Sequence, residues 1–264
     1  MYEEWYFTEY YQEGEIEDWV IPGRRVTPLN TWGHYVLALN LDQERDADID
    51  LTFFFENDEP ATTRYRLGAG RQGTLYLGSR GGFEYEVDLN RRFGMAVKST
   101  TPLMVQCTQG DYIDGSPVTN NMVSNMFVPG PLAAKHRVWY YVDCIVLRSQ
   151  SPLEEREWIT LLNSNAEPAQ VTITFFPGGG FQRPGEEVKR GDTPFRYRLD
   201  VPARRICQVH LHEQVTDVRP NTHYGVKIES SVPITAQATR RIFERGNYAY
   251  SNSIAVLDCF PAGA

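Results

Sequence analysis

Short apolar segments with alternating polar positions run through the whole chain and predict strands. The segments "DIDLTFFF" (Asp48–Phe55) and "QVTITFF" (Gln170–Phe176) alternate polar and apolar residues before they end in aromatic side chains, as half-buried antiparallel strands do. Turn-forming stretches such as "NSNAEP" and "PGGG" separate the segments. No long stretch carries a sustained 3.6-residue period. Many short strands without intervening helices predict an all-β fold of antiparallel strands, either a β-sandwich or a barrel.

The two halves of the chain carry the same pattern in the same order, which predicts a tandem duplication. The motif "RYRL" occurs at Arg64–Leu67 and again at Arg196–Leu199. Other matching positions, each given as the first-half and then the second-half residue, are Trp5 and Trp139, Glu9 and Asp143, Asn40 and Asn163, Gln106 and Gln237, and Thr108 and Thr239. We therefore expect two sandwich domains, over residues 1–129 and 130–264, joined near Val128–Lys135. Two such copies usually pack about a pseudo-twofold axis, and we expect that arrangement here.

Composition narrows the class of protein. With 41% hydrophobic residues the chain can build packed cores, and a formal net charge of -8 argues against general nucleic-acid binding. The four cysteines have no zinc-like spacing, which favours free thiols in a reducing compartment. The acidic N-terminus is unlike a signal peptide, and no apolar run approaches the roughly 20 residues of a membrane span. We expect a soluble, cytoplasmic protein that is not embedded in a membrane and does not bind nucleic acid.

The second half carries several segments in the order found in a known family. They are "VWYYVDC" (Val138–Cys144), "VPARR" (Val201–Arg205) and "SSVPITAQATR" (Ser230–Arg240). On these segments residues 137–256 resemble the sensory rhodopsin transducer family, small soluble β-sandwich proteins of which one member associates with a microbial light-sensing rhodopsin. The resemblance implies a jelly-roll-like sandwich, oligomerisation through sandwich faces and no established enzymatic activity. The first half fits more loosely, with "GAGR" (Gly68–Arg71) where the second half has Pro-Ala-Arg-Arg.

The polar residues that recur between the halves form the candidate ligand-binding site. In the second half the set is Trp139, Asp143, Glu157, Gln237, Thr239 and Arg240, and in the first half it is Trp5, Glu9, His34, Gln106 and Thr108. Gln237 and Thr239 are two apart on a predicted strand and so share a face, and the spacing of four between Trp139 and Asp143 predicts the same.

If these faces coincide, an aromatic wall lies beside a carboxylate, an amide, a hydroxyl and a guanidinium, which suits a polar small molecule such as a sugar. The alternative is structural, because a buried Gln or Thr can satisfy backbone groups at strand ends and an Asp–Arg pair can be a structural ion pair. Arg204-Arg205 and Arg240-Arg241 add local positive charge. That charge could meet an acidic partner, although the acidic first half is the simpler interpretation.

Two further patterns bear on catalysis and metal binding. Asp143 and Glu157 could form a glycosidase pair, but the corresponding first-half residues are not two carboxylates. His210 and His212 in "QVHLHE" are two apart on a predicted strand, which can place two imidazoles on one face. A surface pair on an edge strand is the simpler interpretation. We assign no catalytic residue, no metal ligand and no cofactor.

The expected function is non-catalytic. We expect a binding or signalling-adaptor protein that recognises a partner protein or a small polar ligand and forms a homo-oligomer. The alternative is a carbohydrate-binding or carbohydrate-active protein that uses the same polar set, and a third possibility is a metal-dependent enzyme that uses His34 and Glu9. A ligand site requires Trp5 and Trp139 to be partly exposed beside their carboxylates, whereas a scaffold buries both.

Overall fold

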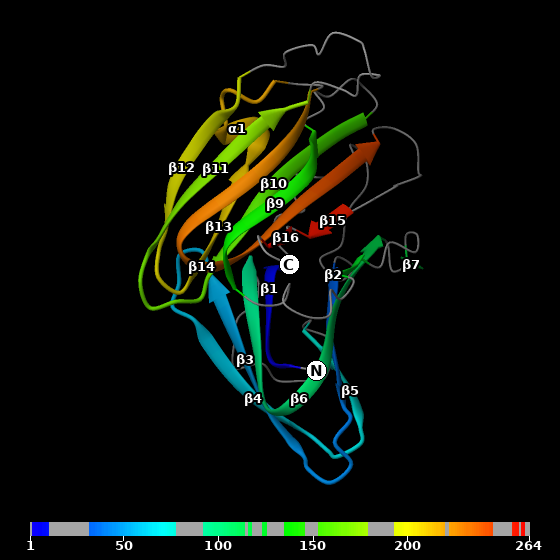
Figure 1. Cartoon of the computed structure of the whole chain (residues 1–264). Helices are drawn as coiled ribbons and strands as arrows, with labels where there is room; N and C mark the ends of the chain where they lie inside the picture. The colour runs from blue at the N-terminus through cyan, green and yellow to red at the C-terminus, as the bar shows by residue number, and fades with distance from the viewer. Residues whose placement is uncertain are drawn as a thin grey trace, which may run out of the picture.

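The computed structural model places a β-sheet in each half of the chain (Figure 1). It describes residues 2–10, 32–77, 92–113, 116–117, 123–125, 135–145, 153–178, 193–219, 222–244, 255–258 and 260–261. The one helix in these ranges, α1 (Leu211–Gln214), has four residues, so no described helix is long and apolar enough to cross a membrane.

The first half forms an antiparallel sheet of eight strands. The strands are β1 (Tyr2–Tyr10), β2 (Trp32–Asn40), β3 (Ala47–Phe55), β4 (Ala61–Leu67), β5 (Gln72–Tyr76), β6 (Phe93–Ile113), β7 (Ser116–Pro117) and β8 (Val123–Asn125). Their order is β4-β3-β6-β2-β5, and β1, β7 and β8 also pair with β6. The first part of β6 pairs with β1 and β3, and its second part pairs with β2 and β8. Because one long strand belongs to two layers, the sheet curls around its own core.

The second half repeats this arrangement. Its strands are β9 (His136–Ile145), β10 (Leu153–Asn163), β11 (Ala169–Pro177), β12 (Phe195–Val201), β13 (Arg205–His210), β14 (His223–Glu244), β15 (Ala255–Asp258) and β16 (Phe260–Pro261). Their order is β12-β11-β14-β10-β13, which is the first-half order with eight added to each strand number. The strands β9 and β15 pair with β14 as β1 and β8 pair with β6. The predicted all-β fold and the repeat are confirmed; the predicted linker falls mostly outside the described residues, so the boundary at 129/130 stays a prediction.

A β-bulge recurs at the same place in both halves. On β1 the pairing with β6 shifts between Phe7 and Tyr10, and on β9 the pairing with β14 shifts between Tyr141 and Cys144. A bulge adds a residue to one strand and so changes which face the following residues occupy. Trp139, Tyr141 and Cys144 are accordingly all buried, although the last two are three residues apart. The spacing-of-four argument that put Trp139 and Asp143 on one face therefore does not hold across this bulge.

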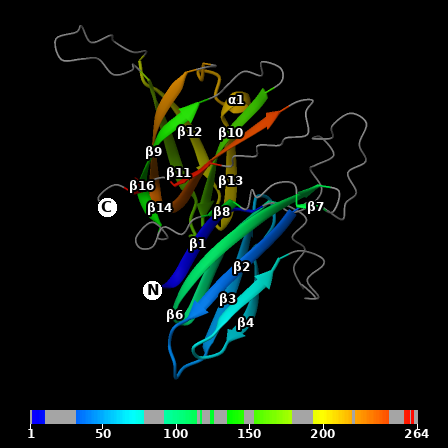
Figure 2. The ribbon, with the colours of Figure 1, turned by 90° about the vertical axis from the view of Figure 1, so that its right-hand side faces the viewer.

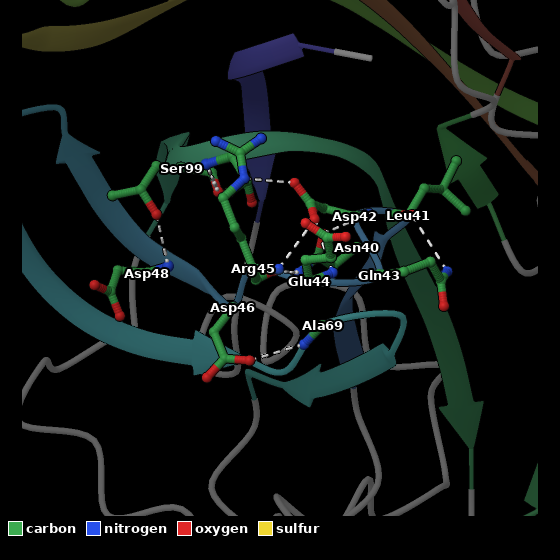
Figure 3. Close-up of polar contacts among 12 residues, drawn as sticks. Asn40, Leu41, Asp42, Gln43, Glu44, Arg45, Asp46, Asp48, Ala69 and Ser99 are labelled. Carbon is green, nitrogen blue, oxygen red and sulfur yellow. Dashed lines mark hydrogen bonds and ion pairs between the residues drawn. The ribbon is translucent and has the colours of Figure 1, made fainter.

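The turn after the second strand of each half is organised by a buried asparagine. Figure 3 shows the turn of the first half, around Asn40. Asn40 donates its side-chain amide to the backbone oxygens of Arg45 (2.8 Å) and Gly68 (3.3 Å), and its Oδ1 accepts from the backbone N–H of Asp42 (3.1 Å). This internal hydrogen bonding lets a polar side chain be buried without an unpaired group.

Asn163 makes the same contacts in the second half. It donates to the backbone oxygens of Glu167 and Pro202 and accepts from the backbone N–H of Asn165 at 3.1 Å. The two asparagines are therefore loop organisers. Their recurrence follows from the architecture of the repeat.

In each half, the turn between the fourth and fifth strands (β4 to β5, and β12 to β13) contains one residue with a backbone conformation in the left-handed region. Gly70 has φ 61° and Arg204 has φ 55°, and their N–H groups donate to the equivalent backbone oxygens of Asp42 and Asn165. Glycine adopts this region freely, whereas an L-residue is strained there. "GAGR" and "PARR" thus build the same turn, so the loose sequence match of the first half at this point does not mean a different structure.

Each half has its own hydrophobic core. The first core includes Trp5, Leu51, Phe53 and Met95, and the second includes Trp139, Ile173, Phe175 and Ile228. These residues come from the inward positions of alternating strands such as β3 and β11, whose burial patterns match the sequence pattern.

A third, smaller cluster joins the two halves, which lie stacked with β1 at the junction (Figure 2). Phe54 packs against Leu162 and Ile206 of the second half, with Tyr6 and Ala96 beside them. The residues come from the outer face of β1, β3 and β6 in the first half and from the outer face of β10 and β13 in the second.

The contact between the halves therefore uses different faces. In a pseudo-twofold pair, equivalent residues would be buried together, but Phe54 is 5% exposed and its counterpart Phe176 is 43% exposed. The expectation of a pseudo-twofold arrangement is wrong, because the halves meet head to tail.

Candidate functional site

Both tryptophans of the predicted site lie in hydrophobic cores. Trp5 and Trp139 are each 2% exposed. The indole N–H of Trp139 is directed at the backbone oxygens of Ile234 (3.0 Å) and His136 (3.2 Å), as expected for a buried indole. Neither ring offers an open aromatic wall, and this burial favours the scaffold alternative for the two tryptophans.

Gln237 lies on the other side of its strand from the core. Its neighbours Ala236 and Ala238 belong to the second-half core, whereas Gln237 accepts a hydrogen bond from the hydroxyl of Thr8 in the first half at 2.6 Å. The side chain is 8% exposed. The structure therefore does not bring Gln237 together with Trp139. Gln237 is part of the contact between the halves.

Glu157 is a buried carboxylate between the layers of the second half. It is fully buried, and its Oε1 accepts a hydrogen bond from the hydroxyl of Tyr141 at 3.1 Å. It follows the alternation of Ile159 and Leu161, which belong to the core. Glu157 thus points toward the interior, away from the face that carries Gln237.

The remaining members of the predicted set are placed only by their backbones. The side chains of Glu9, His34, Thr108, Asp143, Thr239 and Arg240 lie outside the described part of the structure. The pairing register puts Arg240 opposite Glu157, Thr239 opposite Trp158 and Thr108 opposite Tyr35. Gln106, the counterpart of Gln237, is exposed. Ligand binding by the set as a whole therefore stays a prediction.

The histidine pair is not on one strand. β13 ends at His210, and His212 lies in α1, so the two imidazoles do not alternate along a strand as the sequence predicted. The ring of His210 instead lies 5.8 Å from that of Trp158, and its Nε2 is 3.4 Å from a guanidinium nitrogen of Arg92 in the first half. Among the described residues, no group of three or more His, Cys, Asp or Glu side chains could hold a metal ion.

The feature that sequence analysis missed is the face between the halves. Besides the Thr8–Gln237 bond, Arg205 pairs with Glu59 of the first half, as the acidic first half led us to expect. Burial and the neighbouring carboxylate of Glu4 raise the pKa of Tyr6 to about 12. A comparison of the two halves could have indicated part of this face, because Ala96 and Ile206 occupy positions where the other half has Lys227 and Gln72.

A second missed feature is the difference in charge between the outer strands β4 and β12. Arg64 is bonded to Asp50 on β3 at 2.6 and 3.0 Å, which lowers the pKa of that carboxyl. In the second half, the pairing register places Arg198 opposite Thr172, the position equivalent to Asp50, and Arg196 opposite Thr174. Both are exposed, and no carboxylate of the described residues forms an ion pair with either. The second half therefore presents a basic strip of two arginines, Arg196 and Arg198, at positions where the first half has Thr62 and the paired Arg64.

These observations define a duplicated β-sandwich protein in which several recurring polar residues serve packing and turn formation. Residues 135–256 match the family model described as "Anabaena sensory rhodopsin transducer". The second half of the chain is therefore a domain of this family, which confirms the resemblance drawn from its sequence.

Two solved structures are similar to parts of the chain. The Anabaena sensory rhodopsin transducer has 26% sequence identity and a TM-score of 0.30, and the match covers 39% of this chain and 81% of that one. A Thermotoga maritima protein, "1070", has 17% identity and a TM-score of 0.37, and the match covers 48% of this chain and 95% of that one. No curated protein sequence matches the chain.

Proposed function

We propose that this protein is a non-catalytic signalling adaptor that recognises a protein partner through the surface of its second half. The observation that carries the proposal is the burial of the predicted ligand-site residues: both tryptophans lie in cores and Gln237 is bonded to Thr8. A partner would then have to be recognised by the outer surface of the molecule. The name of the matching family, a transducer of a sensory rhodopsin, supports a role in signalling by contact between proteins.

The basic strip on β12 is the surface we propose for the partner. Arg196 and Arg198 project from an outer strand opposite neutral threonines, and Lys227 lies nearby on β14, where it is bonded to Glu229 at 2.7 Å. Guanidinium groups without carboxylate partners suit a partner segment rich in Asp or Glu, since they can form bidentate charge-assisted hydrogen bonds. The partner class is therefore an acidic protein segment.

Charge reversal tests this proposal. The double variant Arg196→Glu with Arg198→Glu removes the basic strip, and Arg64→Glu with Arg66→Glu is the matched control on the equivalent strand of the first half. Proteins crosslinked to the full chain in cells of its source are compared among these variants by mass spectrometry. We expect one acidic partner that is retained by the control and lost by the second-half variant. A partner captured equally by both variants, or none, contradicts the proposal.

A small polar ligand or a sugar is the competing function. A thermal-shift panel of mono- and disaccharides on the unmodified chain separates the two proposals, because a ligand that binds only the folded state raises Tm. We expect no shift. A saturable shift that is abolished by Glu157→Gln would favour the ligand site.

We also propose a cytoplasmic location. Among the described residues, Cys107, Cys144 and Cys207 form no disulfide, and burial together with the charge of Glu56 raises the pKa of Cys207 to about 11. Such thiols behave as buried apolar side chains, as expected in a reducing compartment.

A further inference from the structure

The strand β12 lies at an edge of the sheet of the second half (Figure 1). Among the residues that the structure describes, it pairs with β11 alone, and its equivalent β4 pairs with β3 alone. An edge strand has a row of backbone N–H and C=O groups that point away from the sheet and can pair with another strand. Several classes of protein bind an extended peptide as an additional strand at such an edge.

The edge at β12 is regular along its whole length. Proteins commonly block a sheet edge with a bulge, a proline, a very short strand or charged side chains. β12 has seven residues, none of them proline, and its register with β11 runs without a shift from Phe195 to Val201. Of these devices it carries only charge, at Arg196, Arg198 and Asp200. Such an edge repels a strand of the wrong charge and attracts one of complementary charge.

Three successive residues of β12 are larger than their counterparts in β4. By the two pairing registers, Ala61–Thr63 of β4 corresponds to Phe195–Tyr197 of β12. Phe195, Tyr197 and Leu199 pack against the core of the second half but are only half-buried. A strand added beside β12 would place its own side chains next to them and cover part of this apolar surface.

The outer face of β12 carries its charges in a fixed order. Side chains alternate along a strand, so Arg196, Arg198 and Asp200 share the exposed face. In the first half, Arg64 at the position of Arg198 is bonded to Asp50, whereas neither arginine of β12 is in an ion pair with a described carboxylate. An antiparallel strand would therefore fit best with a neutral or basic residue first and two acidic residues after it, at every second position.

We infer that β12 binds an extended acidic segment of the partner protein as an additional strand, antiparallel as every described strand pair of this half is. The acidic residues of the segment lie opposite Arg198 and Arg196, and the basic or neutral residue lies opposite Asp200. The residues between them are apolar and lie beside Tyr197 and Phe195. Backbone hydrogen bonds supply affinity, and the charged pairs fix the register.

This inference rests on the proposed function, because it takes the same acidic partner and assigns the conformation in which that partner binds. A synthetic peptide tests it on the full chain. The peptide is capped at both ends, carries a fluorescent label, and alternates valine with lysine, glutamate and glutamate, in this order from its N-terminus. We expect saturable binding, followed by fluorescence anisotropy at low ionic strength, where charge pairs are screened least.

Variants of the two edge strands locate the binding site. Arg196→Thr with Arg198→Thr should weaken binding at least about tenfold, because two charged pairs are lost. Arg64→Thr with Arg66→Thr is the matched control, since it removes the same charge from β4, and it should bind the peptide like the wild type. Both changes are at exposed positions, and circular dichroism checks that the fold is retained.

Backbone methylation separates strand addition from simple attraction between charges. In an added strand, the N–H groups of every second residue point toward β12 and the others point away. N-methylation of the valines removes one of these sets, and N-methylation of the charged residues removes the other. One methylated peptide should bind at least about tenfold more weakly, and the other should bind like the unmodified peptide.

The outcomes distinguish this inference from the proposed function. Binding that requires Arg196 and Arg198 but responds alike to both methylations would overturn strand addition and leave the acidic partner in place. An absence of saturable binding up to about 1 mM peptide, or binding that is unchanged without the two arginines, would overturn the inference as well. Peptide binding as expected, with no acidic partner found by crosslinking in cells, would support the edge and contradict the proposed function.

Discussion

Gln237 and Gln106 occupy the same place in the repeat but meet different surroundings. Gln237 is buried and accepts a hydrogen bond from Thr8, whereas Gln106 is exposed in the first half. The same residue type can therefore hold two halves together at one site and face solvent at the other.

Removal of these two side chains should have unequal effects. We expect Gln237→Ala to lower the free energy of unfolding by about 1–3 kcal/mol, because it leaves the Thr8 hydroxyl buried without its acceptor. Gln106→Ala should change it by less than about 0.5 kcal/mol, as is usual at exposed positions. Urea unfolding followed by tryptophan fluorescence measures both. Equal losses would mean that the burial of Gln237 contributes nothing.

The strained turn at Arg204 gives a second prediction at this scale. Arg204→Gly should leave stability unchanged or raise it by up to about 1 kcal/mol, because glycine adopts positive φ without strain but gains freedom in the unfolded chain. The mirror substitution, Gly70→Ala, should destabilise by about 1–2 kcal/mol. Thermal unfolding of the two variants is the measurement. A loss of stability in Arg204→Gly comparable to that of Gly70→Ala would contradict the shared turn geometry.

Tyr6 makes stability depend on alkaline pH. Its pKa is raised from the usual 10.0 to about 12 by burial and by Glu4, so the unfolded chain loses the phenolic proton at a lower pH than the folded chain. The folded state then retains more protons, and the free energy of unfolding falls between about pH 10 and about pH 12. Tyr6→Phe removes this contribution, so its stability should fall less steeply over that range. Urea unfolding at a series of pH values tests this, and parallel profiles would contradict it.

At the scale of elements, the strands and their repeat could be predicted because a half-buried strand alternates apolar residues on its buried face with polar residues on its exposed face. The alternation of Asp48–Phe55 and Gln170–Phe176 became β3 and β11 with matching burial. The bulge on β9 could not be predicted, since it depends on the pairing partner, and it undid the spacing argument for Trp139 and Asp143. The predicted strand also ends earlier than expected, since β13 stops at His210 and His212 lies in the short helix α1.

The candidate site was predicted less well than the fold. Recurrence of a residue between two halves indicates a shared requirement, but packing and turn formation impose such requirements as strongly as binding does. Asn40 and Asn163 recur because both close the same turn. Trp5 and Trp139 recur because each lies in the core of its half. Sequence alone cannot separate these roles. Alternation shows on which face of a strand a residue lies, but it does not show what packs against that face.

The strands β3 and β11 carry a direct prediction at this scale. Phe54→Ala should destabilise the chain by roughly 3 kcal/mol, because it empties the cluster with Leu162 and Ile206. Phe176→Ala, at the same position of β11, should cost less than about 1 kcal/mol in dilute solution, since its side chain is 43% exposed. Denaturant unfolding at low chain concentration compares the two. Similar costs would mean that the two faces are covered alike.

For the whole molecule, the central feature is the contact between the two halves. It combines the hydrogen bond between Thr8 and Gln237 with the apolar cluster of Phe54, Leu162 and Ile206. The two halves differ in the charge of their outer strands and in which face they bury, so duplication has produced two domains with different surroundings. In the contact, the first half buries Thr8 and Phe54, and the second half buries Ile206 and Gln237. The equivalent of Phe54 in the second half, Phe176, is exposed, and the second half also presents the basic strip.

The most direct measurement of this account is a double-mutant cycle between Thr8→Val and Gln237→Leu, read as free energies of unfolding. The two residues are 229 positions apart in sequence and share a hydrogen bond of 2.6 Å. Contact between the halves predicts a coupling energy of about 1 kcal/mol, with the double variant less destabilised than the sum of the single ones. Strictly additive effects would contradict the head-to-tail contact on which the account depends.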